Sequence, residues 1–247
     1  MRNLDALLSE DPDRAEALET SVAAFLAQAI TGDFTEDVVD PEELDQHRIF
    51  YRRVGGFGET PGIGVPSILK AYTLNDEDYF VTVAFGGELE GVPFLDMIVE
   101  LKATPHGDGY RFHCPFEERT KDFRTTTLDD VSFRYSGDFD EDRARQFMAT
   151  RAELTRISGL APTPLEYFAF QSLDEMLKSY GLVFDEARCN FLAYDLGSFD
   201  HSGQRYVTGM GDECYMYGYA GRFIRGPEHD RAESYRTMST GFSTLFG

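Results

Sequence analysis

The sequence predicts an α+β fold, in which an N-terminal helix and a curled antiparallel sheet are followed by a second half of mixed α and β structure. Three observations indicate this class. Apolar residues recur at helical spacing over residues 18–30, whereas residues 79–103 alternate with a period of two. From residue 131 onward, strand-like and helix-like segments follow one another in turn. We therefore predict two domains, residues 1–123 and 124–247.

Charge is the most unusual feature of the composition. The 247 residues carry a formal net charge of −21, and the isoelectric point is near 4.5. Such a surface repels phosphate backbones and anionic membranes, so we expect neither nucleic acid nor a membrane as a partner. Arginine greatly outnumbers lysine, which is typical of proteins that work at high salt and also of genomes that favour arginine codons.

The cysteines and the N-terminal residues bear on cofactors and location. Cys114, Cys189 and Cys214 are widely separated and form no Cys-x-x-Cys motif, which argues against a disulfide framework and a thiolate metal site. No secretory signal pattern opens the chain, and no apolar run approaches the roughly 20 residues that span a bilayer. We expect a cytoplasmic protein without a cofactor.

The first half begins with a predicted helix. Asp11-Pro12 supplies a cap and a first-turn proline, and Thr31-Gly32-Asp33 ends the helix. Asp40-Pro41 could open a short helix towards Tyr51. The glycine-rich residues 55–66 are interpreted as a surface loop, because no Gly-Lys-Ser/Thr follows to complete a phosphate cradle.

A meander of antiparallel strands is predicted next, with turn residues between the strands. The expected strands are residues 67–72, 79–85, 94–103 and 110–113. A long helix followed by such a curled sheet resembles the NTF2-like architecture over residues 10–123. That resemblance implies a site on the concave face of the sheet. Its expected lining is Tyr72, Phe80, Phe85 and Phe94, with Asp96 as a possible base.

The second half begins after a polar hinge at residues 117–122. The predicted elements are a strand at 131–135, a long helix capped by residues 138–142, a strand at 165–170, a short helix after a capping box at Ser172, strands at 191–196 and 205–208, and a helix at 229–237. The acidic run at 138–142 lacks the glycine and the spaced final glutamate of a calcium loop, so we interpret it as capping.

The order of elements from Val131 resembles the upstream half of zincin-like metallopeptidases of the gluzincin type. In that family the next helix carries His-Glu-x-x-His, which binds zinc and activates water. Here Glu213 could occupy the place of the general base. No histidine precedes it, however, and Met216 or Tyr217 stands where the second ligand is needed. The resemblance therefore implies a peptidase-like half that lacks zinc ligands.

The strand–turn–helix stretch at 206–223 supplies the main candidate site. Asp212 and Glu213 lie where a helix start exposes backbone amides, so they could act in capping or in chemistry. Tyr215, Tyr217 and Tyr219 could form a packed core stripe or a platform for a stacked ligand. His113 and Cys114 are neighbours on a predicted strand. Their side chains should therefore point to opposite faces and not form a nucleophile–base pair.

These observations favour a non-catalytic protein that binds an unknown small molecule or protein. One alternative is a metal-dependent, peptidase-like hydrolase with Glu213 as the base. A second is an NTF2-like enzyme that binds a small molecule in the residue 67–113 sheet.

Overall fold

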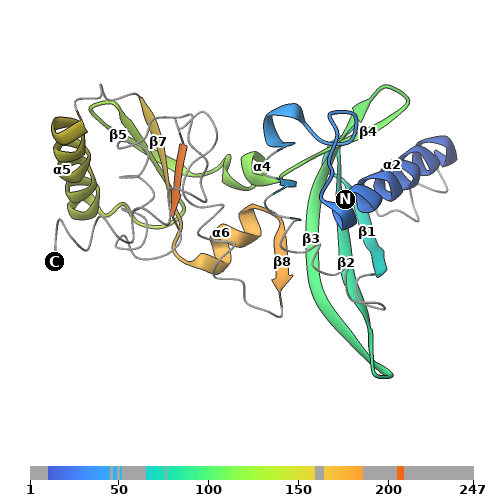
Figure 1. Cartoon of the computed structure of the whole chain (residues 1–247). Coiled ribbons are helices and arrows are strands. Elements are labelled where there is room, and N and C mark those ends of the chain that lie inside the picture. The colour runs from blue at the N-terminus through green and yellow to red at the C-terminus, as the bar shows by residue number, and fades with distance from the viewer. Residues whose placement is uncertain are drawn as a thin grey trace. The chain divides into compact units, whose positions relative to one another are not determined.

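The computed structural model describes residues 11–44, 47–48, 51, 65–75, 77–158, 164–185 and 205–208. The chain divides into two compact units. The first contains the residues up to Lys121 and a returning segment that starts at Leu177, and the second contains Asp122–Met176 and the described residues 205–208. The α+β class, with an N-terminal helix and an antiparallel sheet, is confirmed (Figure 1).

Helix α2 (Pro12–Thr31) begins and ends where the sequence predicts. The Asp11 carboxylate accepts a hydrogen bond from the Arg14 amide at 3.1 Å, which satisfies one of the free amides of the first turn. At the other end Gly32 adopts a left-handed conformation with φ of +74°, and its amide donates to the Gln28 carbonyl. The helix buries one stripe of side chains: Ala15, Leu18, Val22, Phe25, Leu26 and Ala29.

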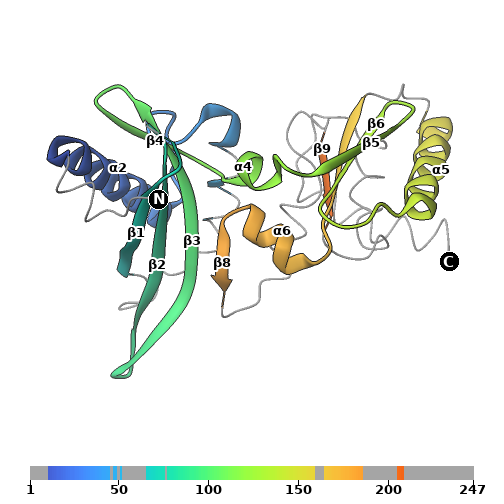
Figure 2. The same cartoon turned by 180° about the vertical axis from the view of Figure 1, so that it is seen from behind.

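The first unit contains a five-stranded antiparallel sheet. Its strands are β1 (Val65–Thr73), β2 (Tyr79–Leu89), β3 (Val92–His106), β4 (Gly109–His113) and β8 (Leu182–Asp185). The order is β1-β2-β3-β4, and β8 pairs with β3. Figure 2 shows β2 and β3 as a long curved hairpin. The sequence predicted the first four strands but not β8.

Side chains on one face of this sheet form the core of the first unit together with α2. Val81, Val83, Val99 and Leu101 are all buried on that face. The Phe25 ring from α2 packs against several aromatic rings, and its centroid lies 4.9 Å from that of Phe112 on β4. Each fully buried side chain of this size stabilises the fold by roughly 1.5–3 kcal/mol. On β2 the opposite face is buried as well, at Phe80, Thr82 and Ala84, so the period of two there does not separate a buried face from an exposed one.

Two short segments of the first unit add detail to the sequence prediction. The segment after Asp40 begins with a 3₁₀ turn, η1 (Pro41–Glu43), and its described residues Leu44, His47, Arg48 and Tyr51 are helical, so the predicted short helix towards Tyr51 is confirmed. The predicted polar hinge at 117–122 contains helix α4 (Phe116–Thr120), which the sequence analysis did not predict. Helix α4 forms because Phe116 is buried against the ring of Tyr180, with centroids 4.7 Å apart, and Thr120 donates to the Phe116 carbonyl. Those contacts stabilise a helix despite the polar composition of the segment. The first unit ends at Lys121, one residue beyond α4.

The second unit contains a mixed four-stranded sheet in the order β5-β6-β7-β9. Its strands are β5 (Arg124–Leu128), β6 (Val131–Tyr135), β7 (Leu165–Ala169) and β9 (Arg205–Thr208). β5 and β6 form an antiparallel hairpin, whereas β6, β7 and β9 run parallel. The sequence missed β5 because its side chains are exposed or half-buried, so they give no apolar alternation.

Helix α5 (Glu141–Ser158) connects the parallel strands β6 and β7 and packs on the sheet. The core of this unit contains Val131, Phe133, Ala144, Phe147, Leu165 and Tyr167. Arg151 is buried on α5, and its guanidinium donates to both carboxylate oxygens of Asp130, which lowers the pKa of that carboxyl group.

A short helix, α6 (Leu173–Ser179), follows β7. The Ser172 hydroxyl oxygen accepts from the Glu175 amide at 3.1 Å, and the Glu175 carboxylate accepts from the Gln171 amide at 2.8 Å. The predicted cap at Ser172 is therefore confirmed.

Candidate functional site

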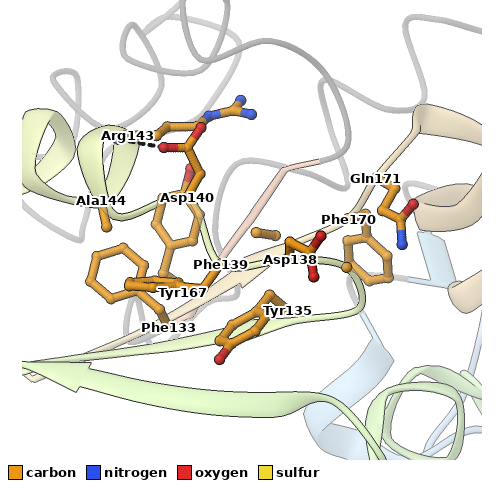
Figure 3. A pocket seen from close by; sticks show the side chains of 12 residues that line it. Phe133, Tyr135, Asp138, Phe139, Asp140, Arg143, Ala144, Tyr167, Phe170 and Gln171 are labelled. Atoms are coloured by element: carbon orange, nitrogen blue, oxygen red, sulfur yellow. Dashed lines mark hydrogen bonds between the residues drawn. The ribbon is translucent and has the colours of Figure 1, made fainter.

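A pocket lies in the second unit, next to the ends of β6 and β7 (Figure 3). Its volume is about 240 Å³. It is lined by Phe133, Tyr135, Gly137, Asp138, Phe139, Asp140, Arg143, Ala144, Tyr167, Ala169, Phe170 and Gln171. β6 and β7 are parallel, so both strands end at the same edge of the sheet. The crevice outside the carboxyl ends of parallel strands is where open α/β sheets bind ligands.

Local sequence explains how the pocket is built. Gly137 follows β6, and a Cβ at this position would lie 2.8 Å from the side chain of Gln171, so glycine lets the exposed Gln171 side chain lie close to the backbone here. The chain then turns, and the Asp140 carboxylate accepts from the Arg143 amide at 3.0 Å at the start of α5. The acidic run therefore caps the helix, as predicted, and it also brings two carboxylates to the pocket.

Aromatic rings form one wall of the pocket. The ring centroid of Phe139 lies 5.9 Å from that of Phe133 and 5.2 Å from that of Tyr135. Phe133 in turn lies 5.1 Å from Tyr167. These distances are typical of favourable aromatic packing. Because three of the four rings come from β6 and β7 and the fourth from the turn after β6, the position of the wall depends on the register of the two strands.

The polar side chains lie at the rim. The Asp138 side chain is fully exposed, and one carboxylate oxygen lies 3.6 Å from the guanidinium of Arg124. That guanidinium also donates to the Gly137 carbonyl and lies 5.1 Å from the ring centroid of Tyr135. At this rim the Arg124 guanidinium therefore contacts both the aromatic ring of Tyr135 and the carboxylate of Asp138.

A second polar cluster lies on the face of the first unit's sheet that does not carry the α2 core. Glu100 on β3 is buried, accepts a hydrogen bond from the Tyr72 hydroxyl at 2.8 Å and pairs with the guanidinium of Arg119 on α4. Arg119 lies 5.4 Å from the ring centroid of Phe80. Burial, followed by the hydrogen bond to Glu100, raises the pKa of Tyr72 to about 12, so this hydroxyl stays protonated and donates at neutral pH.

A third cluster combines a hydroxyl, an imidazole and a carboxylate. His113 Nε2 lies 2.8 Å from the Thr104 hydroxyl, and His113 Nδ1 lies 3.6 Å from a carboxylate oxygen of Asp40. The order of groups is that of a hydroxyl nucleophile, its base and an orienting acid. The carboxylate is beyond hydrogen-bond distance, and neither pocket described in the structure includes Thr104 or His113. The cluster is therefore interpreted as cross-strand stabilisation between β3 and β4.

The protonation of His113 gives a testable pH dependence. Burial lowers the pKa of His113; the nearby Glu43 and Asp40 carboxylates raise it, and Lys102 and His47 lower it further. The unfolded chain therefore binds the proton first as the pH falls, so the free energy of unfolding should decrease below about pH 6.5. We expect His113→Gln to reduce this decrease, measured by urea denaturation at pH 7.5 and 5.5.

The matched control for this measurement is His106→Gln, which changes an exposed histidine in the same hairpin. His106 Nε2 lies 2.8 Å from the Arg111 guanidinium. This variant therefore controls for the loss of an imidazole from the same hairpin, and it should change the pH dependence less than His113→Gln does. Equal pH dependence in the His113→Gln variant and the unmodified protein would contradict the assignment.

The residues of the main predicted site, Asp212, Glu213, Tyr215, Tyr217 and Tyr219, lie outside the described residues, as does the turn between β9 and the predicted helix. Their roles stay predictions. The strand that leads to this turn, β9, has the predicted bounds, residues 205–208.

The residues proposed for a pocket in the first unit do not all lie on one face of the sheet. The rings of Tyr72 and Phe80 lie together, with centroids 5.5 Å apart. Phe85, however, lies an odd number of positions from Phe80 on β2, so it faces the α2 core, where its ring packs against Tyr51. The backbone of Asp96 lies in β3, and its side chain lies outside the described part of the structure.

The interpretation of His113 and Cys114 is consistent with the structure. Cys114 is buried, and its thiol donates to the Tyr180 carbonyl at 3.6 Å, whereas His113 contacts Thr104. The described residues include no group of three or more histidine, cysteine, aspartate or glutamate side chains placed to hold a metal ion. No helix in the described ranges is long and apolar enough to cross a membrane.

Comparison of the chain with protein-family models, curated proteins and solved structures found no match. The NTF2-like and zincin-like resemblances therefore stay predictions. The pocket next to β6 and β7 is the candidate site that sequence reasoning missed. The sequence does contain a pattern that indicates its location. A predicted strand is followed by Gly137 and then by a capped helix, which is typical of a parallel strand that leads into its crossover helix.

Proposed function

We propose that this chain is a small-molecule-binding protein whose binding site is the pocket next to β6 and β7. The observation that carries the proposal is the combination of an aromatic wall and a polar rim around a cavity at the carboxyl ends of two parallel strands. Apolar rings supply contact area for a ligand, and the few polar groups at the rim supply its orientation.

The size of the cavity limits the ligand. Pockets for drug-sized molecules have volumes of roughly 300–1,000 Å³. The volume here is about 240 Å³, which suits a single ring or a short branched group. A dinucleotide or an extended peptide would have to bind largely outside the cavity.

The chemistry of the lining favours binding over covalent catalysis. The lining residues named above include no cysteine, serine, threonine, histidine or lysine. They therefore offer neither the thiol or aliphatic hydroxyl nucleophile nor the imidazole base of most acyl-transfer sites. Asp140 already caps α5, and Asp138 already pairs with Arg124, so both rim carboxylates have structural roles.

A pair of glutamine substitutions tests the proposal. Gln171 lines the pocket and Gln146 lies on α5 away from it, and both side chains are exposed. We expect Gln171→Trp to obstruct the pocket and to weaken binding of a single-ring ligand by about tenfold or more, because steric exclusion removes most of the apolar contact. Gln146→Trp should leave binding unchanged.

The measurement is saturation-transfer NMR with benzylamine, benzyl alcohol and benzoate as probes of different charge. Binding of at least one probe, weakened by Gln171→Trp and not by Gln146→Trp, supports the pocket. Absence of binding by all three probes, or equal effects of the two tryptophan substitutions, would overturn the proposal.

A further inference from the structure

We infer that the pocket next to β6 and β7 selects organic cations, with a quaternary or primary ammonium group placed against its aromatic wall. The inference rests on the proposed binding function of this pocket and adds the chemical class of the ligand. It follows from three features of the described residues: the rings, the charge at the rim and the contact that Arg124 makes there.

The rings provide the first argument. Phe133, Tyr135, Phe139 and Tyr167 all line one small cavity, and adjacent rings are inclined to one another by 35–62°. Aromatic faces carry negative electrostatic potential, and several rings at different inclinations around one cavity are the usual receptor for an ammonium group. Parallel stacking of a flat neutral ligand would instead require two rings facing each other across the cavity.

The charge at the rim provides the second argument. Residues 138–142 contain four carboxylates, and Asp138 and Asp140 line the pocket itself. Figure 3 shows the Asp138 carboxylate among the aromatic side chains and the Arg143 guanidinium extending beyond the rings at the upper edge of the view. These carboxylates repel anions at the mouth, and the net charge of −21 attracts cations over longer distances.

The contact made by Arg124 provides the third argument. Its guanidinium lies over the Tyr135 ring while it pairs with Asp138, so this rim already stabilises one cation by an aromatic face and a carboxylate together. Arg124 and Arg143 oppose a cationic ligand at this rim, and Arg145 pairs with Glu141. Residues 138–142 supply four carboxylates against these three guanidinium groups, so the charge along this edge is negative and favours a positively charged ligand.

Choline and its neutral isostere 3,3-dimethylbutan-1-ol test the inference, because they share shape and differ in charge. We expect choline to bind about tenfold more tightly, from the cation–π contact and the rim carboxylates combined. Choline binding should also weaken as sodium chloride is raised from 0.05 to 0.5 M, whereas binding of the isostere should not.

Two aspartate substitutions provide the matched variants. Asp138 lines the pocket and Asp142 lies in the first turn of α5 outside the lining; both are exposed, and both changes to asparagine remove one negative charge. We expect Asp138→Asn to weaken choline binding about threefold or more and to leave the isostere unaffected. Asp142→Asn should have a much smaller effect on either probe.

The outcomes separate the cation inference from the binding function. If the isostere or benzyl alcohol binds as well as choline, and Gln171→Trp weakens that binding, the pocket binds ligands but the inference about cations is wrong. If choline binds and Asp138→Asn has no larger effect than Asp142→Asn, the rim does not select the charge and the inference is also wrong. If no probe binds, both the inference and the proposed function fail.

Discussion

Gly181→Ala is expected to destabilise the first unit by about 4 kcal/mol or more, which places it among the largest effects for a single methyl group. Gly181 immediately precedes β8 and has a φ of +93°, a conformation that L-residues rarely adopt. A Cβ at this position would overlap the backbone carbonyl oxygen of Glu100 and lie 3.2 Å from the ring of Pro115. Neither neighbour is the end of a flexible side chain, so the backbone itself must move.

The contacts around Gly181 explain why that movement is costly. The Glu100 amide donates to the Gly181 carbonyl at 2.7 Å, and β8 continues directly into its pairing with β3. The preceding residue, Tyr180, packs its ring on Phe116. A displaced backbone at Gly181 would therefore weaken both the edge of the sheet and the packing of α4.

The control for this prediction is Gly107→Ala in the turn between β3 and β4. Gly107 also has a positive φ, +58°, but a Cβ there would meet nothing within 4 Å. Only the conformational penalty of about 1–2 kcal/mol applies. Chemical denaturation of both variants measures the difference, and equal losses of stability at the two positions would show that crowding at Gly181 is unimportant.

Arg119→Met is expected to destabilise the first unit by about 2–3 kcal/mol. Removing one member of a buried ion pair typically costs about 3–5 kcal/mol, because the remaining charge stays buried without compensation. The loss here should be smaller, since the Arg119 side chain is 44% exposed while that of Glu100 is 5% exposed. The Tyr72 hydroxyl would remain as a donor to the stranded carboxylate.

A double-mutant cycle separates the charge from the packing of the Arg119 side chain. Glu100→Gln combined with Arg119→Met should be more stable than Arg119→Met alone, because the neutral amide can be buried with less penalty and can still accept from Tyr72. Lys121→Met is the control, since Lys121 is exposed and its pair with Glu118 is at the surface. This control should change stability by no more than about 0.5 kcal/mol. If the double variant is less stable than Arg119→Met, an uncompensated charge does not explain the loss.

Local interactions account for most of the elements that the sequence predicted. Asp11 and Ser172 cap their helices through hydrogen bonds to amides three residues away, so a short stretch of sequence contains all the participants. The alternation along residues 79–85 and 94–103 likewise predicted strands, because one face of the sheet packs against α2. On β2 the other face is also buried, at Phe80, Thr82 and Ala84. The helix at 116–120 was not predicted, because it depends on Tyr180, more than 60 residues away.

The sequence predicted less of the candidate site than of the fold. The capping role of the acidic residues at 138–142 could be predicted, because it is local. The cavity beside them could not, because it requires Phe133 from one strand, Tyr167 from another and Gln171 beyond it to meet. Similarly, nothing near Glu100 in the sequence indicates that Tyr72 and Arg119 would surround it.

By itself, the sequence determined the α+β class, the acidic surface charge, the caps of α2 and α6, and the strands whose side chains alternate. Tertiary structure alone decided that β8 returns to pair with β3, that Glu100 is buried with a tyrosine and an arginine, and that aromatic rings and carboxylates enclose a pocket at the ends of β6 and β7. The physical reason is the range of the interactions. Caps, turns and periodic burial are encoded within a few residues, whereas strand pairing and cavity shape depend on which distant segments share the same space.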